Sequence, residues 1–394
     1  MIDFYRIKSP LTQITEKNMA DYTAELSKAL GEELKNVDID TYVKDEFALL
    51  YVASGGSEGF FLEIFDQIKD RPCYILTSGD SNSLAASMEI LSYLNTHGGS
   101  GEIIHGDVNK VAKRILSLRN TTLAKKKLAG KKYGCIGKSS NWLIASSFDP
   151  KAVEEKTGMS FVDIDINELI EEINKNQYEE NEYTALIKTK SFDAKEVEKA
   201  LYVYGACKRL CNKYDLSAVS VRCFDLLDTV CTTGCLALAI LNAEGIYAGC
   251  EGDIPALLTM LIAGTVTGER CFLCNPSRFD TKDMTAVFAH CTLPIDMVND
   301  FVLNTHFESG IGVAIQGTFE NQPCTVIKCS GSLDRYHAQE GEIIPHEFSN
   351  MLCRTQIKLK LDDFSYFLTN PINNHHIICF GKHEAEIKDF FESL

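Results

Sequence analysis

Residues 248–297 constrain the possible folds of this chain more than any other stretch. Within it, residues 254–264 are apolar nearly all round, a pattern typical of a helix that is buried on every side. Residues 270–274 and 285–289 are apolar runs of the length that strands usually have. The stretch therefore predicts a core α/β segment, in which a turn leads into a buried helix and then into two strands.

Four polar side chains stand at the ends of these apolar elements. Glu251 and Asp253 come just before the predicted helix, and Asn275 and His290 directly follow the two predicted strands. Ligands of open α/β sheets bind outside the carboxyl ends of the strands, so we expect a site here. Oxygen donors with an imidazole suit Mn²⁺, Mg²⁺ or a similar divalent ion. Helix caps and a hydrogen-bonded histidine at a strand end remain the alternative interpretation.

The rest of the chain falls into three predicted domains. Residues 1–125 form the first, because strands and helices alternate from residue 46 onward with Gly and Ser at the strand ends, as in a parallel sheet. A Lys-rich connection at residues 121–132 marks the boundary. A second alternation of strands and helices follows it and leads without a linker into the opening stretch, which gives a second α/β domain at residues 126–302.

Residues 303–394 form the third predicted domain, which is rich in β-structure. Short apolar strands are separated there by Gly, Pro, Asn and Asp turns, and a helix is expected only at residues 383–394. This pattern predicts an antiparallel sheet or a small barrel. The predicted fold class is therefore α/β, with two parallel-sheet domains followed by an antiparallel β-rich domain.

Composition excludes several classes of function. A net charge of −16 argues against binding nucleic acid, which requires clustered Lys and Arg. No apolar run reaches the roughly 20 residues of a membrane span, and the N-terminal residues lack the apolar segment of a signal peptide. We therefore expect a cytoplasmic protein that uses neither a membrane nor a nucleic acid as a partner. The 15 cysteines are expected to be reduced, mostly buried thiols.

Several short motifs together resemble the L-fucose isomerase and L-arabinose isomerase superfamily, and within it the L-fucose isomerase-like proteins. They are spread over nearly the whole chain and are specific only as a set. The motifs are NSLAASMEIL (82–91), CEGD (250–253), TG (267–268), FLCNP (272–276), AHCTLP (289–294), THFESGIG (305–312), CRTQ (353–356) and NHH (374–376).

The resemblance implies a fold, an ion and a set of ligands. The fold would be two Rossmann-like α/β domains and a C-terminal β-rich domain, and the ion would be Mn²⁺. Glu251 stands at the position of the family's first acidic ligand, and Asn275, 24 positions later (275 − 251), at that of the second. His290 and a C-terminal histidine would complete the ligands. His376 is the predicted C-terminal ligand, and His375 is the near alternative.

The resemblance also implies aldose–ketose isomerisation of a sugar or modified sugar through an ene-diol, in trimers or hexamers. Such chemistry needs one group that removes a proton and one that returns it. Glu251 and the residue at position 275 would be the catalytic pair, but the amide of Asn275 cannot take up a proton. Asp253, Asp280 and Glu308 are the possible replacements. The alternative is a non-isomerising relative, either a sugar-binding or regulatory protein or a lyase or epimerase.

Further residues are predicted to contact the sugar. His306 and Glu308 lie at the entrance to the β-rich region, where a structural turn is the alternative. Arg354 would bind a hydroxyl or acidic group, or else form a salt bridge. The complete predicted set is Asn82, Ser83, Asp253, His306, Glu308, Arg354 and His375.

Three more residues are candidates for the site. Arg222 and Asp225 follow a predicted strand and are expected near the cleft. Trp142, the only tryptophan, would stack on a sugar ring or pack in the core.

Overall fold

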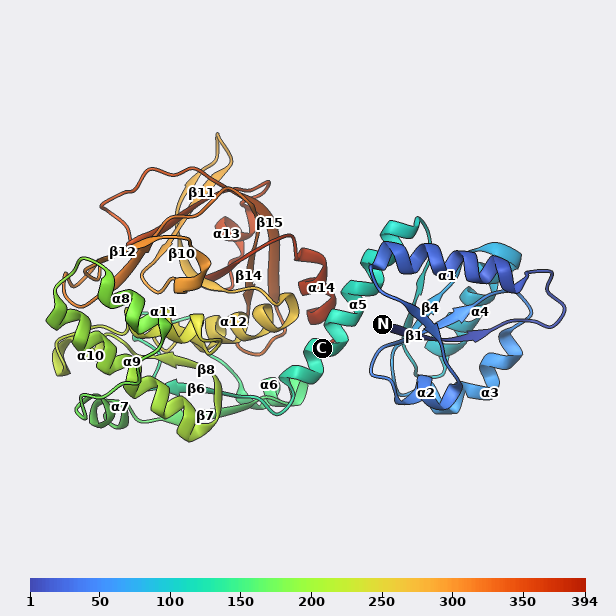
Figure 1. The fold of residues 1–394 in the computed structure, drawn as a ribbon, viewed down its shortest axis with the longest axis horizontal. Coiled ribbons are helices and arrows are strands. Elements are labelled where there is room, and N and C mark those ends of the chain that lie inside the picture. Colours follow the sequence, from blue (N-terminus) through green and yellow to red (C-terminus); the bar gives the residue numbers. More distant parts are fainter. The chain divides into compact units, whose positions relative to one another are not determined.

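The computed structural model describes residues 1–394, which divide into two compact units, Met1–Leu123 and Ala124–Leu394. Two parallel sheets and an antiparallel β-rich part make up the chain, so the predicted fold class is confirmed (Figure 1). The first unit holds one parallel sheet. The second combines the other parallel sheet with the antiparallel part.

The first unit is a five-stranded parallel sheet with helices on both faces. Its strand order is β2-β1-β3-β4-β5, with every neighbouring pair parallel. Helices α1 and α5 pack on one face and α3 and α4 on the other, so the strands are buried from both sides. The elements are β1 (Ile2–Ile7), α1 (Glu16–Leu30), β2 (Leu34–Asn36), α2 (Ile39–Lys44), β3 (Ala48–Val52), α3 (Glu58–Ile68), β4 (Cys73–Leu76), α4 (Ser83–Thr96), β5 (Gly101–Ile104) and α5 (Val108–Leu128).

The Lys-rich connection predicted at residues 121–132 is mostly helix. Helix α5 continues to Leu128, and Lys125, Lys126 and Lys127 lie in its last turn. Positive side chains are favourable there, because they face the negative end of the helix dipole. A charge run that resembles a linker is thus the end of a helix.

The second unit begins with a four-stranded parallel sheet of order β7-β6-β8-β9. The chain leaves β6 toward β7 and then returns to the other side of β6 as β8, so the order reverses between β6 and β8. Ligands of such sheets bind at this reversal, outside the carboxyl ends of the strands. The elements are β6 (Lys132–Ile136), α6 (Pro150–Thr157), β7 (Ser160–Ile164), α7 (Ile166–Ile173), α8 (Glu182–Thr189), α9 (Ala194–Tyr214), β8 (Leu216–Val221), α10 (Asp225–Thr229), α11 (Cys235–Ala243), β9 (Tyr247–Cys250) and α12 (Ile254–Thr267).

The antiparallel part is a closed barrel of order β10-β11-β16-β15-β14-β17, beside a two-stranded sheet of β12 and β13. It begins at Phe272, earlier than the boundary predicted at residue 303, because β10 pairs with β17 from the end of the chain. Residues 365–369 form a short helix, although a helix was expected in this part of the chain only at residues 383–394. The elements are β10 (Phe272–Asp280), β11 (Thr285–His290), β12 (Phe301–Asn304), β13 (Ala314–Gly317), β14 (Pro323–Cys329), β15 (Tyr336–Ile344), β16 (Thr355–Lys360), α13 (Ser365–Thr369), β17 (His376–Phe380) and α14 (Glu384–Glu392).

Helix α12 lies between the parallel sheet and the barrel (Figure 1). It packs against β8 and β9 on one side and against β14, β17 and α14 on the other. All residues from Ile254 to Gly264 are buried, which confirms the prediction of a helix enclosed on every side. Pro255 occupies the first turn, where a missing N–H costs no hydrogen bond.

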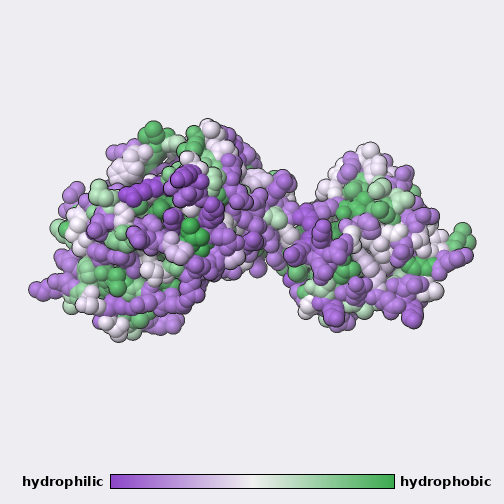
Figure 2. Space-filling model, turned by 90° about the horizontal axis from the view of Figure 1, so that it is seen from above, coloured by the Kyte–Doolittle hydropathy of each residue, from purple (hydrophilic) through white to green (hydrophobic).

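Hydrophilic residues cover most of the surface that Figure 2 shows, with smaller hydrophobic patches between them. None of the helices combines the length and apolar character needed to cross a membrane. The structure contains only free cysteines, and nearly all of them are buried.

We expect the substitution Gly205→Ala to destabilise the second unit. Gly205 lies inside α9, where an added Cβ would stand 2.2 Å from the carbonyl oxygen of Gln177 and 2.7 Å from Cα of Tyr178. Because both are backbone atoms, the helix or the loop must shift, at a cost of about 1–3 kcal/mol in the free energy of unfolding. Urea denaturation measures it.

The matched control is Gly59→Ala in α3, where no atom lies within 4 Å of the added Cβ. Helix propensity alone should raise stability there by about 0.5–1 kcal/mol. Equal effects of the two substitutions would contradict the close packing at Gly205.

Candidate active site

A tight turn after β9 presents Glu251. Glu251 and Gly252 both have left-handed backbone angles, with φ of 65° and 66°. A Cβ at residue 252 would lie 2.4 Å from the carbonyl oxygen of Lys138, so only glycine fits. The left-handed conformation is uncommon for a side chain such as glutamate, and such strain is concentrated at functional sites. The turn therefore holds the Glu251 carboxylate in a defined place.

Asp253 ends this turn and begins α12. Its Oδ1 accepts a hydrogen bond of 2.9 Å from the backbone N–H of Ala256, as an N-cap does. Its Oδ2 lies 2.8 Å from Nδ1 of His375, which directly precedes β17. Both side chains are fully buried. One carboxylate thus caps the buried helix and fixes the imidazole of a residue 122 positions away.

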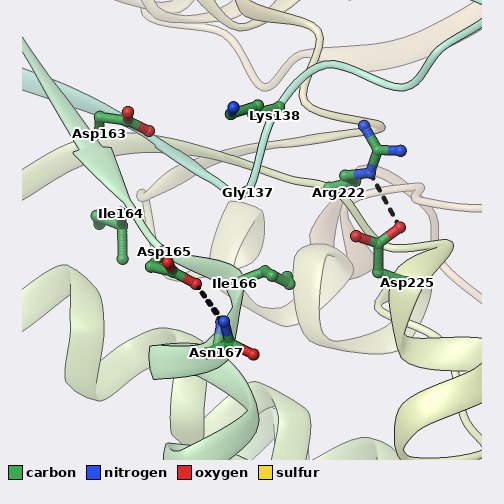
Figure 3. Close-up of a pocket in the computed structure, with 9 residues that line it drawn as sticks. All are labelled: Gly137, Lys138, Asp163, Ile164, Asp165, Ile166, Asn167, Arg222 and Asp225. Atoms are coloured by element: carbon green, nitrogen blue, oxygen red, sulfur yellow. Dashed lines mark hydrogen bonds and ion pairs between the residues drawn. The ribbon is translucent and has the colours of Figure 1, made fainter.

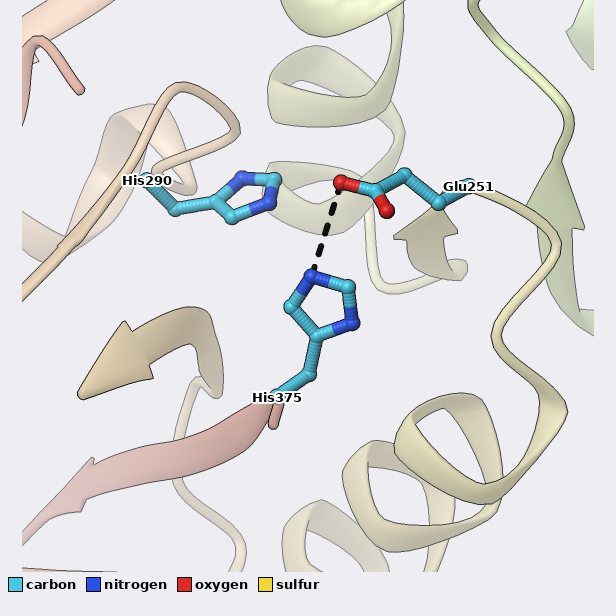
Figure 4. A group of neighbouring side chains, drawn as sticks. All are labelled: Glu251, His290 and His375. Atoms are coloured by element: carbon cyan, nitrogen blue, oxygen red, sulfur yellow. Dashed lines mark ion pairs between the residues drawn. The ribbon is translucent and has the colours of Figure 1, made fainter. Parts of the chain in front are cut away.

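Glu251, His290 and His375 form a compact cluster (Figure 4). Nε2 of His375 lies 3.5 Å from Oε1 of Glu251, and the two imidazole rings are 5.4 Å apart between centroids. His290 ends β11, and its Nδ1 is 3.0 Å from Oγ1 of Thr292. One donor atom from each of the three residues lies within 4.8 Å of the others.

The cluster could hold a divalent cation. Nε2 of His375 is buried and has no hydrogen-bond partner. Asp253 holds its other nitrogen, which is how carboxylates orient histidine ligands of metals. A donor set of one carboxylate and two imidazoles suits Mn²⁺, Fe²⁺, Zn²⁺ or a related ion.

Burial and charge set the protonation of the cluster. Burial alone would raise the pKa of Asp253, but the charge of Lys328 and the hydrogen bond from His375 bring it down to about 2. Burial would lower the pKa of His375, yet its hydrogen bond to Asp253 and the nearby carboxylate of Glu251 raise it to about 9. Without a cation, His375 therefore carries the positive charge that offsets the two acids.

The positive charge of His375 affects the pKa values of Glu251 and His290, the other two members of the cluster. Burial alone would raise the pKa of Glu251, but contacts with His375, His290 and Trp142 lower it overall. Burial, reinforced by the charge of His375, lowers the pKa of His290 to about 4, so its imidazole is neutral near pH 7. Glu251 is accordingly ionised, and His290 offers a neutral nitrogen.

His376, the predicted C-terminal ligand, lies outside the cluster, and His375 lies inside it. Successive side chains along an extended segment point to opposite sides, so only one of the two can face Glu251. Nε2 of His376 is 3.0 Å from the Tyr366 hydroxyl, and its Nδ1 is 2.8 Å from the carbonyl oxygen of Asn374. Both nitrogens of His376 are thus engaged.

Asn275 also lies outside the group of three. Strand β10 continues to Asp280, so Asn275 lies within a strand, opposite Ala289, instead of at a strand end. Its Oδ1 accepts a hydrogen bond of 3.2 Å from Nδ2 of Asn374. The structure therefore shows the amide oxygen bonded to a neighbouring side chain.

Two of the residues predicted to contact the sugar, Asp253 and Arg354, make other contacts within the second unit. Asp253 has no exposed surface and lies behind His375, where it cannot touch a sugar. Arg354 donates from Nε and Nη2 to the carbonyl and hydroxyl oxygens of Thr305. It thus supports the loop that carries His306 and Glu308.

That loop approaches the cluster. His306 is buried, with its Nδ1 2.9 Å from Oγ of Ser309. Burial raises the pKa of Glu308, and the negative charge of Glu251 raises it further. Asp280 and Glu308 were both possible replacements for a carboxylate at position 275. The charge of Glu251 affects the pKa of Glu308, whereas Asp280 accepts hydrogen bonds from the exposed turn after β10.

Asn82 and Ser83 belong to the first unit, not to the unit that carries the cluster. Ser83 is buried, and its Oγ accepts a hydrogen bond of 2.7 Å from the Thr77 hydroxyl. Asn82 lines a hollow of about 560 Å³ together with Gly55 and Gly56.

A cleft of about 670 Å³ opens at the carboxyl ends of β6, β7 and β8 (Figure 3). Arg222 and Asp225, which were expected near a cleft, line it and pair at 2.9 Å between Nε and Oδ1. The loop after β6 joins this cleft to the cluster: Nη1 of Arg222 donates to the Ser139 carbonyl, and the Ser140 N–H donates to the Glu251 carbonyl. Sequence reasoning missed the other charged lining residues, Lys138, Asp163 and Asp165.

Trp142 does not pack in the core, which was one of its two predicted roles. It is 53% exposed, and its Nε1 donates a hydrogen bond of 2.6 Å to Oε2 of Glu251. Its ring meets Phe224 edge-on, with 4.8 Å between centroids. Trp142 thus fixes one oxygen of Glu251, while His375 faces the other. The sequence singled out Trp142 as the only tryptophan, but it gave no sign that Glu251 is its hydrogen-bond partner.

No family model matches the chain, but part of the chain is similar to a known protein. Over 99 residues the chain is 30% identical to the sulfoquinovose isomerase of Clostridium sp. (strain MSTE9). The similar segment covers 25% of this chain and 22% of that protein, so the chain spans about a fifth of the length of this relative. The likeness is to a sugar isomerase, over a limited segment.

Trp142 provides a direct test of cation binding. Because its indole donates to Glu251, Mn²⁺ held by Glu251 should quench the fluorescence of this single tryptophan. We expect saturable quenching of the wild-type protein and none in Glu251→Gln, measured by fluorescence titration. Trp142→Phe supplies the background signal. Unchanged emission on adding Mn²⁺ would contradict the cation site.

Proposed function

We propose that this chain is a divalent-metal-dependent sugar isomerase that interconverts an aldose and a ketose through an ene-diol. The observation that carries the proposal is the convergence of Glu251, His290 and His375, in which the buried Nε2 of His375 makes no hydrogen bond and faces Oε1 of Glu251 at 3.5 Å. The similarity to a protein named sulfoquinovose isomerase supports the same reaction class. We propose Mn²⁺ as the ion, a carbohydrate as the substrate and a trimer or hexamer as the assembly, following the family resemblance.

In this proposal, Glu251, His290 and His375 hold the cation, and Glu251 also moves protons. A divalent cation held by these three residues would supply polarisation of the sugar carbonyl and would offset the negative charge of an ene-diol. Glu251 would remove the proton from the carbon beside the carbonyl, since its carboxylate is ionised and Trp142 fixes one of its oxygens. Its fixed geometry favours this transfer, because the carboxylate needs little reorganisation.

A second group must supply a proton to the carbon that was the carbonyl carbon of the substrate. Asn275 cannot, since an amide is neither ionised nor protonated near neutral pH and so cannot act as an acid or a base. Asp253 has a pKa of about 2 and is enclosed behind His375, so it stays ionised. Glu308 has a raised pKa and surface exposure, which suit a proton donor, and we assign it this role.

A second candidate function is a non-isomerising relative that keeps the sugar and the cation. The amide at position 275 favours it, because the family's second acidic ligand is replaced there. In that case the chain would bind a sugar for regulation, or would catalyse a lyase or epimerase step that needs a single carboxylate base.

Replacing the two carboxylates should separate binding from proton transfer. We expect Glu251→Gln to abolish Mn²⁺ binding and turnover. Glu308→Gln should retain Mn²⁺ binding and lose about 10²–10⁴-fold in kcat, the usual contribution of one acid–base group. Calorimetry and a panel of aldoses and ketoses provide the readouts. Glu347→Gln, at an exposed position in the loop after β15, is the matched control and should behave as wild type. Full activity in Glu251→Gln would rule out the proposal.

Asn275→Asp distinguishes the two candidate functions. A carboxylate at this position restores the family's charge, so an isomerase should keep or increase its turnover of aldoses and ketoses. Loss of activity on this substitution, with a wild-type product that is not the isomeric sugar, would instead support the second function. Product analysis by NMR provides the measurement.

A further inference from the structure

Two buried thiols, those of Cys223 and Cys250, meet beside the turn that carries Glu251. Their sulfur atoms lie 2.6 Å apart, although the residues are 27 positions apart in the sequence. Both are free cysteines, and both side chains are buried. The sulfur atoms are closer than van der Waals contact, and a movement of about half an ångström would bring them to the length of a disulfide bond.

The parallel sheet of the second unit brings these two residues together. Strands β8 and β9 are neighbours, and Val221, the last residue of β8, pairs with Cys250, the last residue of β9. Cys223 follows two residues after the end of β8. Across the same strand ends, the N–H of Gly252 donates to the Val221 carbonyl at 3.2 Å. A bond between the two sulfur atoms would therefore link strand ends that hydrogen bonds already hold together, so it can form without unfolding the sheet.

A small hollow gives an oxidant access to Cys223. Its volume is about 10 Å³, which is room for a molecule of about the size of water. Cys223 and Cys235 line it, together with Phe224 and Leu227, whose side chains are half-buried. Cys250 is not among the lining residues. Because access decides which thiol an oxidant attacks, a small peroxide reaches Cys223 first, and Cys250 reacts with the product that forms there.

We propose that Cys223 and Cys250 form an oxidation site, which hydrogen peroxide converts into a disulfide that links the end of β8 to the Glu251 turn and moves Glu251. In the first step, the Cys223 sulfur attacks one peroxide oxygen. An S–O bond forms, the O–O bond breaks, and the thiol proton joins the departing hydroxide as water. Cys223 is thereby oxidised to a sulfenic acid, and the peroxide is reduced.

The second step closes the disulfide. The Cys250 sulfur displaces the hydroxyl group from the sulfenic acid of Cys223, so that an S–S bond forms and the S–O bond breaks. The thiol proton of Cys250 leaves with the hydroxyl group as a second water molecule. An added dithiol reverses the oxidation by thiol–disulfide exchange and becomes a disulfide itself.

Trp142 connects this oxidation site to the candidate metal cluster. Its ring meets Phe224, the residue after Cys223, with 4.8 Å between centroids. Its Nε1 donates at 2.6 Å to Glu251, the residue after Cys250. A bond that draws the two cysteines together also moves the residues that follow them, so oxidation changes both contacts of Trp142 and displaces the Glu251 carboxylate. None of these contacts involves a cation, so the inference does not depend on the proposed function.

Peptide mapping of the full chain tests the chemistry. After hydrogen peroxide and blocking of the free thiols, mass spectrometry should find a peptide cross-linked between Cys223 and Cys250, which dithiothreitol separates. Cys250→Ser should stop at the sulfenic acid of Cys223, which dimedone traps. Cys223→Ser should leave Cys250 as a thiol. The exposed Cys231 is the internal control for the peroxide, and its oxidation while Cys223 and Cys250 remain thiols would overturn the proposal.

The matched control is Cys235→Ser, which changes another thiol that lines the same hollow. It should form the Cys223–Cys250 link to the same extent as wild type. A link from Cys223 to Cys235 in the wild-type protein would overturn the assigned pair. If a serine variant does not fold, Cys223→Ala or Cys250→Ala replaces it and is judged by the same criteria.

Fluorescence of the single tryptophan tests the connection to Glu251. Oxidation without metal should change the emission of Trp142 in the wild-type protein, dithiothreitol should restore it, and Cys223→Ser should show no change. A wild-type disulfide that leaves this emission unchanged would overturn the proposed movement of Glu251. A protein that forms the disulfide and changes its emission but binds no Mn²⁺ would contradict the proposed function and support this inference.

Discussion

The contact between Asp253 and His375 holds the second unit and its candidate site together. One oxygen of Asp253 caps α12, the helix enclosed between the parallel sheet and the barrel, and the other accepts the Nδ1 proton of His375 from the end of the chain. Because both groups are fully buried, neither can exchange its partner for water without a large cost. The position of the cluster therefore follows from the same packing that stabilises the core.

The barrel brings the remaining residues to this contact. Strand β10 pairs with β17, so His375 arrives beside the turn after β9 only when the chain's end has joined the barrel. His290 comes from the end of β11, the other neighbour of β10. Glu251 is presented by a strained turn and held by Trp142. The site thus forms only with the complete unit, which explains why its members are far apart in the sequence.

Local sequence patterns predicted much of the fold around the site and two of its three members. The all-round apolar sequence gave α12 its correct place and burial, and the position of Glu251 and His290 at the ends of elements indicated that they could meet. Other features depend on tertiary structure that local patterns do not contain. Whether His375 or His376 faces inward is set by the pairing of β17, and Asn275 lies within a strand because β11 continues alongside it.

The most direct measurement is anomalous scattering at the manganese edge from crystals soaked in Mn²⁺. The account predicts one peak between the Glu251 carboxylate, an imidazole nitrogen of His290 and Nε2 of His375, with Nδ1 of His375 still bonded to Asp253. A peak at His376 or Asn275 without His375, or well-ordered crystals with no peak at the cluster, would contradict it.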